Sequence, residues 1–462
     1  MKEILIISLL GIGVLVADIL KLRKLIMPLI LLGLTGMIVC SVLDWGRNEI
    51  PFQQYGGMLQ FDHLALAFTM AISLISIFWF TLTADYFSGD QTRRTDLYAL
   101  AVFSICGAVV LVSFSNMMTL FLGLEILSIP LYVLAASEKR NILSNEAGFK
   151  YFFLGSLASA IILFGIALVY GATGSFDVET IAARVAEIHS TSTLLKIGIV
   201  MILAGFAFKV SVAPFHLWAP DVYQGAPTAV TAFMATIVKT AAFAALYKLF
   251  SVSFAATDGD YTNIIAGMIA LTLVVANLIA ARQTNSKRLL AYSSISHAGF
   301  MMGIVMLANQ IPGKYLLYYV LTYSIASLTA FGALHHVSSF QDGDESENAF
   351  KGLVKRNPMM AGAMTLALLS MAGIPPLCGF LAKYYVISGV LAHHSVWLVI
   401  LMILTSVVSV YYYLKLIIAM FTPLENSGRI VVSKTNQFLY GFFAVLLIAL
   451  FFGASLLELV EF

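Results

Sequence analysis

An all-α integral membrane protein with about fourteen transmembrane helices is the fold class that the sequence predicts. Of its 462 residues, 60% are hydrophobic and only 11% are charged, and the mean hydropathy is +0.93. Soluble domains are about 45–50% apolar and about 25% charged, so a soluble fold of this length could not cover so much apolar surface. Runs of about 20 apolar residues, the length that crosses a bilayer, recur along the whole chain.

The apolar runs give the order of the expected spans. The longest polar connections cover residues 44–62, 171–193 and 340–356, and none has the composition of a soluble domain. We interpret the first run as a retained helix and not a signal peptide, because Glu3 precedes it and no clear small-residue cleavage site follows. The expected spans are 4–20, 25–43, 64–84, 97–115, 117–136, 147–170, 194–212 with a continuation to about 224, 227–250, 262–281, 288–308, 314–339, 357–374 with a continuation to about 391, 396–420 and 436–457.

Basic residues predict the orientation, because Lys and Arg accumulate in the cytoplasmic connections of membrane proteins. With the connections numbered alternately, one side holds Lys21, Arg23, Lys24, Arg93, Arg94, Lys139, Arg140, Arg282, Lys287, Arg288, Lys351, Lys355, Arg356, Arg429 and Lys434. The other side holds only Lys2, Arg47, Arg184, Lys196 and Lys314. This bias predicts that both termini lie on the non-cytoplasmic side, and it supports the number of spans.

The three cysteines do not suggest a redox or metal centre. Cys40, Cys106 and Cys378 fall in three different apolar runs, and an odd number of cysteines in separate spans argues against a disulfide framework. Because the sequence has no C-x-x-C motif and no Cys/His cluster, we expect this chain to bind no metal or cofactor.

Four ionisable residues fall deep inside apolar spans and are the strongest candidates for function. Glu125 lies in the fifth span, Lys209 in the seventh, Lys239 in the eighth and Lys383 in the twelfth. Each costs roughly 2.5–3.5 kcal/mol at a helix centre, and such residues usually face the bundle interior and mark ion paths. Because a neighbouring charge shifts the protonation equilibrium of a buried amine, a series of such lysines can pass protons along.

Each of these residues also has a plainer interpretation. Glu125 and Lys209 could form only a structural salt bridge, whereas Lys239 and Lys383 have no acid in their own helices. Lys248 and Lys415 lie near span ends, where extension to the lipid headgroups explains them. The remaining candidates are Lys150, one turn after Glu146 and able to pair with it; His297, which is either a hydrogen-bonded core residue or a relay member; and the weaker candidates His216, His335 and His336.

Two spans contain helix breakers next to a candidate lysine. The seventh carries Pro214 and Pro220, with Pro227 after them, and the twelfth carries Gly373, Pro375, Pro376 and Gly379. Paired interruptions in two halves are typical of inverted-repeat transporters, although prolines could also simply kink both helices. The breaks lie five spans apart, which predicts helices 4–8 repeated upside down as helices 9–13. The expected units are 1–96 with three helices, 97–250 as the first repeat, 251–421 as the second and 422–462 with the last helix.

The motifs resemble those of a known family. The segments GFAFKVSVAPFHLWAPDVYQGAPTAVTAFMATIVK, NSKRLLAYSSISHAGF and AGIPPLCGFLAKYYV are similar to the antiporter-like membrane subunits of NADH–quinone oxidoreductase (respiratory complex I) and of related multi-subunit sodium/proton antiporters. The resemblance covers most of the chain, while the first three spans and the last match only in hydropathy. It implies fourteen helices, with helices 4–8 and 9–13 related by inversion.

The resemblance also implies roles for individual residues. Glu125 matches a glutamate that modulates the neighbouring lysine, Lys209 the lysine of the broken seventh helix, and Lys239 a connecting lysine. Lys383 matches the lysine of the exit half, where one sister subunit carries glutamate. A longer sister ends in a lateral helix and an extra span, and we expect that arm to be absent here because the chain stops at Phe462.

The function that follows is that of a proton-translocating subunit of the enzyme. Protons would pass from the cytoplasm through Lys209, tuned by Glu125, then Lys239 and His297 to Lys383 and outside. NADH, FMN, iron–sulfur clusters and quinone would be used in other subunits. The expected partners are the other membrane subunits and lipid, with no nucleic acid, in a bacterial inner membrane. The alternatives are a subunit of a sodium/proton antiporter and a purely structural subunit that conducts nothing.

Overall fold

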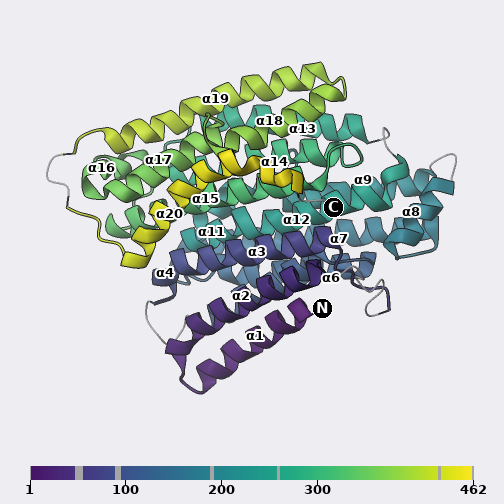
Figure 1. Ribbon diagram of the computed structural model, residues 1–462, viewed down its shortest axis with the longest axis horizontal. Coiled ribbons are helices and arrows are strands. Elements are labelled where there is room, and N and C mark those ends of the chain that lie inside the picture. Colours follow the sequence, from purple (N-terminus) through teal and green to yellow (C-terminus); the bar gives the residue numbers. More distant parts are fainter. Residues whose placement is uncertain are drawn as a thin grey trace.

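The chain folds into one bundle of nearly parallel helices (Figure 1). The structure is a computed structural model that describes residues 2–46, 56–88, 95–187, 192–257, 261–424 and 428–459. These ranges contain no β-strand, only three isolated β-bridges between connections, so the all-α prediction is confirmed. Arg47, Arg93 and Arg94, which contribute to the charge bias, lie outside the described residues.

The long helices follow the predicted order. They are α1 (Lys2–Ile19), α2 (Ile26–Trp45), α3 (His63–Leu82), α5 (Thr95–Val112), α6 (Met117–Ala135), α7 (Ile142–Thr173), α9 (Thr193–Lys209) with α10 (Trp218–Gly225), α11 (Thr228–Phe233) continuing into α12 (Lys239–Lys248), α13 (Thr262–Ala280), α14 (Ser286–Met306), α15 (Gly313–Phe340), α17 (Pro358–Ala372) with α18 (Cys378–Ala392), α19 (Val396–Phe421) and α20 (Lys434–Phe452).

Shorter elements lie in the connections, and two interrupt the eighth span. The short α-helices are α4 (Ala84–Ser88), α8 (Val178–Glu187) and α16 (Leu353–Arg356). The 3-10 turns are η1 (Arg23–Leu25), η4 (Ala255–Thr257), η5 (Glu347–Phe350) and η6 (Gly453–Leu459). The π-helical segments η2 (Met234–Val238) and η3 (Leu249–Ser253) flank α12. Sequence periodicity did not reveal these π segments, which occur often at functional sites.

The fourteen predicted spans all have a counterpart. In the described part of the chain, eleven helices are long and apolar enough to cross a membrane. The other three spans are α1, which has Lys2, Glu3 and Asp18 among its 18 residues, and the pairs α9–α10 and α17–α18, whose halves are each shorter than 18 residues. The beginning of α1 and the end of η6 lie at the same end of the bundle (Figure 1), as an even number of crossings requires.

The centre of the bundle is formed by the eighth and tenth spans. The most apolar window is completely buried in Thr228–Ser253 and in α14, whereas only 28% is buried in α2 and in α20. Lys239 and His297 therefore lie on the two most enclosed of these candidate spans.

Glycines permit close approach where the helices of the first half meet. A Cβ atom added to Gly107 in α5 would lie 2.2 Å from the backbone nitrogen of Leu127 in α6. We predict that Gly107→Ala destabilises the protein by about 1–3 kcal/mol, because overpacking forces the two backbones apart. The measurement is the thermal unfolding midpoint of the purified protein in detergent. Gly362→Ala is the control, since nothing lies within 4 Å of its added Cβ; equal midpoints for the two variants would contradict the prediction.

Candidate functional site

Both predicted helix breaks are present, and a lysine lies beside each. α9 ends at Lys209, residues 210–217 form turns that contain Pro214, and α10 then begins at Trp218. Pro220 does not break a helix, contrary to the prediction: it lies in the first turn of α10, where a proline loses no backbone hydrogen bond.

The second break separates α17 from α18. Gly373 ends α17 with a φ of +86°, a conformation that favours glycine. Pro375 and Pro376 lie in the turns before α18, and Gly379 follows at the start of that helix. A Cβ on Gly379 would lie 1.9 Å from the Ser370 carbonyl oxygen, so this glycine lets α18 pack directly against the end of α17.

Lys209 is buried without a hydrogen-bonding partner. Its side chain is almost completely enclosed, and neither its Nζ atom nor the Oε1 atom of Glu125 has a hydrogen bond. Glu125 lies close enough to act electrostatically on Lys209, but the two form no ion pair among the described residues. The structural salt bridge is therefore not formed in this conformation.

Aromatic faces surround the Lys209 ammonium group. Its Nζ atom lies 5.6 Å from the ring centroids of Tyr132 and Tyr151, at a distance where a π face attracts a cation. Tyr151 stacks on Trp218, with centroids 4.7 Å apart, and the Trp218 indole donates to the Phe208 carbonyl at 2.9 Å. Trp218, at the end of the helix break, thus positions the Tyr151 ring that faces Lys209.

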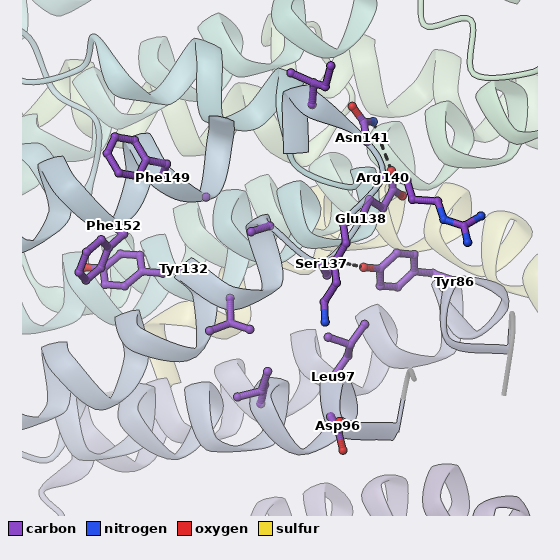
Figure 2. Close-up of a pocket in the computed structure, with 16 residues that line it drawn as sticks. Tyr86, Asp96, Leu97, Tyr132, Ser137, Glu138, Arg140, Asn141, Phe149 and Phe152 are labelled. Carbon is purple, nitrogen blue, oxygen red and sulfur yellow. Dashed lines mark hydrogen bonds between the residues drawn. The ribbon is translucent and has the colours of Figure 1, made fainter. Parts of the chain in front are cut away.

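An open groove reaches this region from one end of the bundle. It has a volume of about 1680 Å³ and lies between α5, α6 and α7. Figure 2 shows Glu138 and Arg140 in its polar part, and Tyr132, Phe149 and Phe152 in its apolar part. The groove is held by a 2.7 Å hydrogen bond between Tyr86 and Ser137. Because Tyr132 both lines the groove and faces Lys209, the groove leads from the polar end of the bundle towards that lysine.

Lys239 is held by hydroxyl and carbonyl groups, not by a carboxylate. Its Nζ atom donates to the carbonyl and to the Oγ atom of Ser294, both at 2.6 Å. Tyr323 donates to the same Oγ atom at 2.8 Å. These contacts join α12 to α14 and α15 in the fully buried centre of the bundle.

His297 lies near both Lys239 and Lys383. It is buried in α14, and both lysines act on it electrostatically. Its ring centroid lies 4.9 Å from that of Tyr323, the residue that bonds the Lys239 partner Ser294. His297 thus joins the polar groups of the second half instead of lying alone in the core.

Lys383 in α18 reaches back to the end of α17. Its Nζ atom donates to the Ala372 carbonyl at 3.1 Å and lies 5.1 Å from the Phe300 ring centroid. The helix break frees this carbonyl, because the chain ends α17 at Ala372. Neither Lys239 nor Lys383 has an ion-pair partner in the described part of the chain, so hydrogen-bonding dipoles and, for Lys383, an aromatic ring stabilise these two amines.

A second charged group forms at one end of the bundle, around α10. Lys150 pairs with Glu146 at 2.6 Å, as its spacing predicts, and with Asp221 at 2.9 Å. Arg288 pairs with Asp221 at 2.8 Å and bonds Gln224 at 2.9 Å. These residues line a polar cleft of about 190 Å³. Sequence reasoning missed Asp221 and Arg288, because the partners come from three helices distant in the chain.

Lys248 does not extend to the headgroups, and this prediction was wrong. The residue is buried and forms a 2.8 Å ion pair with Asp62, which caps α3. Lys415 is half-buried; it pairs with Glu347 at 2.6 Å and donates to the Gln283 carbonyl. Spacing could not reveal either pair, because each joins elements far apart in the sequence.

The weaker histidine candidates are not part of this arrangement. His336 shares a 2.9 Å hydrogen bond with Asn436, and the Nδ1 atom of His216 is buried without a partner in the first break. The described residues contain no cluster of three His, Cys, Asp or Glu residues that could hold a metal ion.

A family profile and curated relatives show which family of proteins this chain belongs to. The family profile described as NADH:quinone oxidoreductase/Mrp antiporter, transmembrane, matches residues 114–409. NADH-quinone oxidoreductase subunit N of Cytophaga hutchinsonii is 44% identical over 97% of this chain and 95% of its own length. The chain belongs to the subunit N family of NADH–quinone oxidoreductases. The subunit N of Flavobacterium johnsoniae is 41% identical over 93% of each chain.

Chains of three solved membrane complexes share this fold. A chain of respiratory complex I from Thermus thermophilus is 33% identical, with a TM-score of 0.85 over 99% of this chain and 98% of that chain. A chain of an archaeal membrane-bound sulfane sulfur reductase is 26% identical, with a TM-score of 0.86 over 99% and 95%. A chain of the Mrp complex from Dietzia has the same fold, with a TM-score of 0.85 over 99% and 95%, at 20% identity.

The Lys248–Asp62 pair predicts a measurable stability difference between two carboxylates. Asp62→Asn keeps the capping oxygen but leaves Lys248 buried and unpaired, so we expect a cost of about 3 kcal/mol. Asp221→Asn breaks pairs that are more exposed and should cost about 1 kcal/mol. Chemical denaturation of the purified protein in detergent measures both. Adding Lys248→Met to Asp62→Asn should recover part of the loss; no recovery would mean that the pair is not the cause.

Proposed function

We propose that this chain moves protons across the membrane as the antiporter-like subunit of a NADH–quinone oxidoreductase. The observation that carries the proposal is a set of four ionisable residues, Glu125, Lys209, Lys239 and Lys383, inside spans that are otherwise apolar. Such groups are costly in a membrane interior and usually mark ion paths. The three lysines have no carboxylate partner among the described residues, so a structural role as ion pairs does not account for them.

The proton path we infer runs through the middle of the bundle. Protons reach Lys209 along the groove that Tyr132 lines, and Glu125 tunes the charge of Lys209. They continue to Lys239, to His297 and to Lys383, and leave on the opposite side. Lys150 and Glu146 lie at the starting end, next to the first helix break. Movement of a proton from one lysine changes the field at the next, which couples the steps.

Electron transfer would take place elsewhere in the complex. We propose that NADH, FMN, the iron–sulfur clusters and quinone belong to other subunits, and that this chain responds to their reaction through charge and conformation. Its partners would be the neighbouring membrane subunits and lipid, in a bacterial inner membrane. The chain's part in the translocase is then proton movement alone.

The second candidate is a subunit of a multi-subunit sodium/proton antiporter. The fold shared with the Mrp chain favours it, but that likeness has 20% identity against 44% for the subunit N relative. Co-purification decides between them: flavin and iron–sulfur proteins, with NADH oxidation, accompany the chain if it belongs to the oxidoreductase.

We further propose that residues 97–250 and 251–421 are two inverted five-helix units, between the segments 1–96 and 422–462. The support is a broken helix at the fourth position of each, α9–α10 and α17–α18, with a buried lysine beside each break. Lys209 precedes its break whereas Lys383 follows its own. Because inversion turns one unit upside down, the half-path of each unit would open to the opposite side of the membrane from that of the other.

Replacing the charges should uncouple the complex. We expect Lys209→Met and Glu125→Gln each to lower proton pumping several-fold, because the first step loses its carrier or the charge that tunes it. The measurement is dye quenching in inverted vesicles driven by NADH, alongside the NADH oxidation rate. Lys434→Met, at an exposed lysine outside the groove and outside the proposed path, is the control. Wild-type pumping by either variant would overturn the assignment.

The proposed orientation places both termini outside the cytoplasm. Lys351, in the connection after α15, would then face the cytoplasm, and Glu179 in α8 would face outwards. We expect an impermeant maleimide to label Glu179→Cys in intact spheroplasts and Lys351→Cys only in inverted vesicles, with the unsubstituted chain as background. The reverse pattern would reject the orientation while leaving the path itself in place.

A further inference from the structure

Both ring nitrogens of His297 meet a tyrosine hydroxyl. The Nδ1 atom shares a 2.9 Å hydrogen bond with Tyr319 of α15. The Nε2 atom shares a 3.4 Å hydrogen bond with Tyr413 of α19. A neutral imidazole has one donor and one acceptor nitrogen, so this ring can accept a proton on one side while it gives one up on the other.

The Tyr413 side of the ring leads towards Lys239. The Tyr413 hydroxyl is hydrogen-bonded to the Ser293 hydroxyl. Ser293 precedes Ser294, the residue that accepts the Lys239 ammonium group and the Tyr323 hydroxyl. Tyr413 and Tyr323 are also near enough to interact electrostatically. These residues form a compact polar group that contains the Lys239 partner.

The Tyr319 side leads towards Lys383. Tyr319 and His297 line a small cavity whose other wall includes Ser370, Gly379 and Ala382. Its volume of about 10 Å³ is close to the smallest that holds one water molecule. Ala382 is the neighbour of Lys383 in α18, so the cavity separates the imidazole from the turn that carries the second lysine.

We propose that Tyr413 and Tyr319 are proton-carrying residues that receive and release the proton relayed by His297 between Lys239 and Lys383. This proposal rests on the proposed proton path and adds two residues to it. Both hydroxyls are fully enclosed by protein. Neutral hydroxyl groups suit a dry stretch of the path, because they bridge two amines without adding a further buried charge.

The proton count of the step balances. Tyr413 gives its proton to Nε2 and takes one from Ser293, which is reprotonated from the Lys239 side. At the same time Nδ1 gives its proton to the Tyr319 oxygen, and Tyr319 releases its own into the cavity towards Lys383. One proton has moved, every group is again neutral, and the imidazole ends with its proton on Nε2. The ring must return to the first tautomer before the next proton passes.

The groups that face the imidazole are few. They are the hydroxyls of Tyr319 and Tyr413, the ring of Tyr323 and, as charges, Lys239 and Lys383. No carboxylate pairs with this histidine in the part of the chain that the structure describes. Proton transfer to and from the His297 ring should therefore depend on the two tyrosines and the two lysines.

The test removes single hydroxyls in the assembled complex. Tyr319→Phe and Tyr413→Phe keep the rings and delete only the oxygen. The matched control is Tyr318→Phe, whose hydroxyl donates to the Leu450 carbonyl at 3.1 Å. We expect the ratio of protons pumped to NADH oxidised to fall about tenfold in the two test variants, since a positioned proton-transfer group contributes on the order of 100-fold or more in enzymes. The control should pump like the wild type.

A second measurement covers variants that fail to assemble and separates proton transfer from packing. A fluorinated tyrosine placed at 319 or 413 keeps the hydroxyl but makes it more acidic. The alkaline limb of the pumping pH profile should then move to lower pH, and it should not move when the same residue is placed at 318. A merely structural role would leave the profile unchanged.

The outcomes separate this proposal from the proposed function. It is overturned if Tyr319→Phe and Tyr413→Phe pump normally, if Tyr318→Phe is equally impaired, or if the fluorinated residues leave the pH profile unmoved. If Lys383→Met lowers pumping while the two tyrosine variants do not, only the tyrosine step fails. If Lys383→Met also pumps normally, the proposed proton path itself fails.

Discussion

The cost of placing charge in an apolar bundle is the constraint on which the rest of this structure depends. An isolated ammonium group in a medium of low polarity must find dipoles, a counter-charge or water. Lys239 has the serine hydroxyl and carbonyl of α14, Lys383 has the carbonyl that a helix break frees, and Lys209 has aromatic faces and the nearby Glu125 but no hydrogen bond. The three lysines are thus solvated unequally, and Lys209 is the least supported.

The helix breaks have a direct role in this solvation. Irregular backbone at membrane depth is tolerated only inside protein or along a wet cavity, and each break combines buried residues, such as Val212 and Leu377, with exposed ones, such as Leu217 and Pro375. The first break positions Trp218, which stacks on the tyrosine beneath Lys209. The second supplies the carbonyl that Lys383 binds. At the second break, glycine and proline therefore contribute by ending α17, which leaves the Ala372 carbonyl free to bind Lys383.

The ends of the bundle use a different kind of electrostatics. Ion pairs such as Asp221 with Arg288 and Lys248 with Asp62 join helices distant in the sequence. They hold the ends of the bundle together, where partial exposure to water lowers the desolvation cost of an ion pair. The interior instead uses hydroxyls and imidazole. Among the described residues, Lys209, Lys239 and Lys383 form no ion pair, and in the proposed path their protonation must stay adjustable.

The sequence by itself determined the all-α class, the fourteen spans, the two breaks and the position of Glu125, Lys209, Lys239 and Lys383 inside apolar spans. It could do so because span length, proline and charge act locally on one helix at a time. Only the tertiary structure decided which side chains meet: that Lys209 and Glu125 are not paired, that Lys248 is paired with Asp62, and that two tyrosines hold His297. Such contacts depend on how distant helices pack, and hydropathy carries no information about which faces of those helices come together.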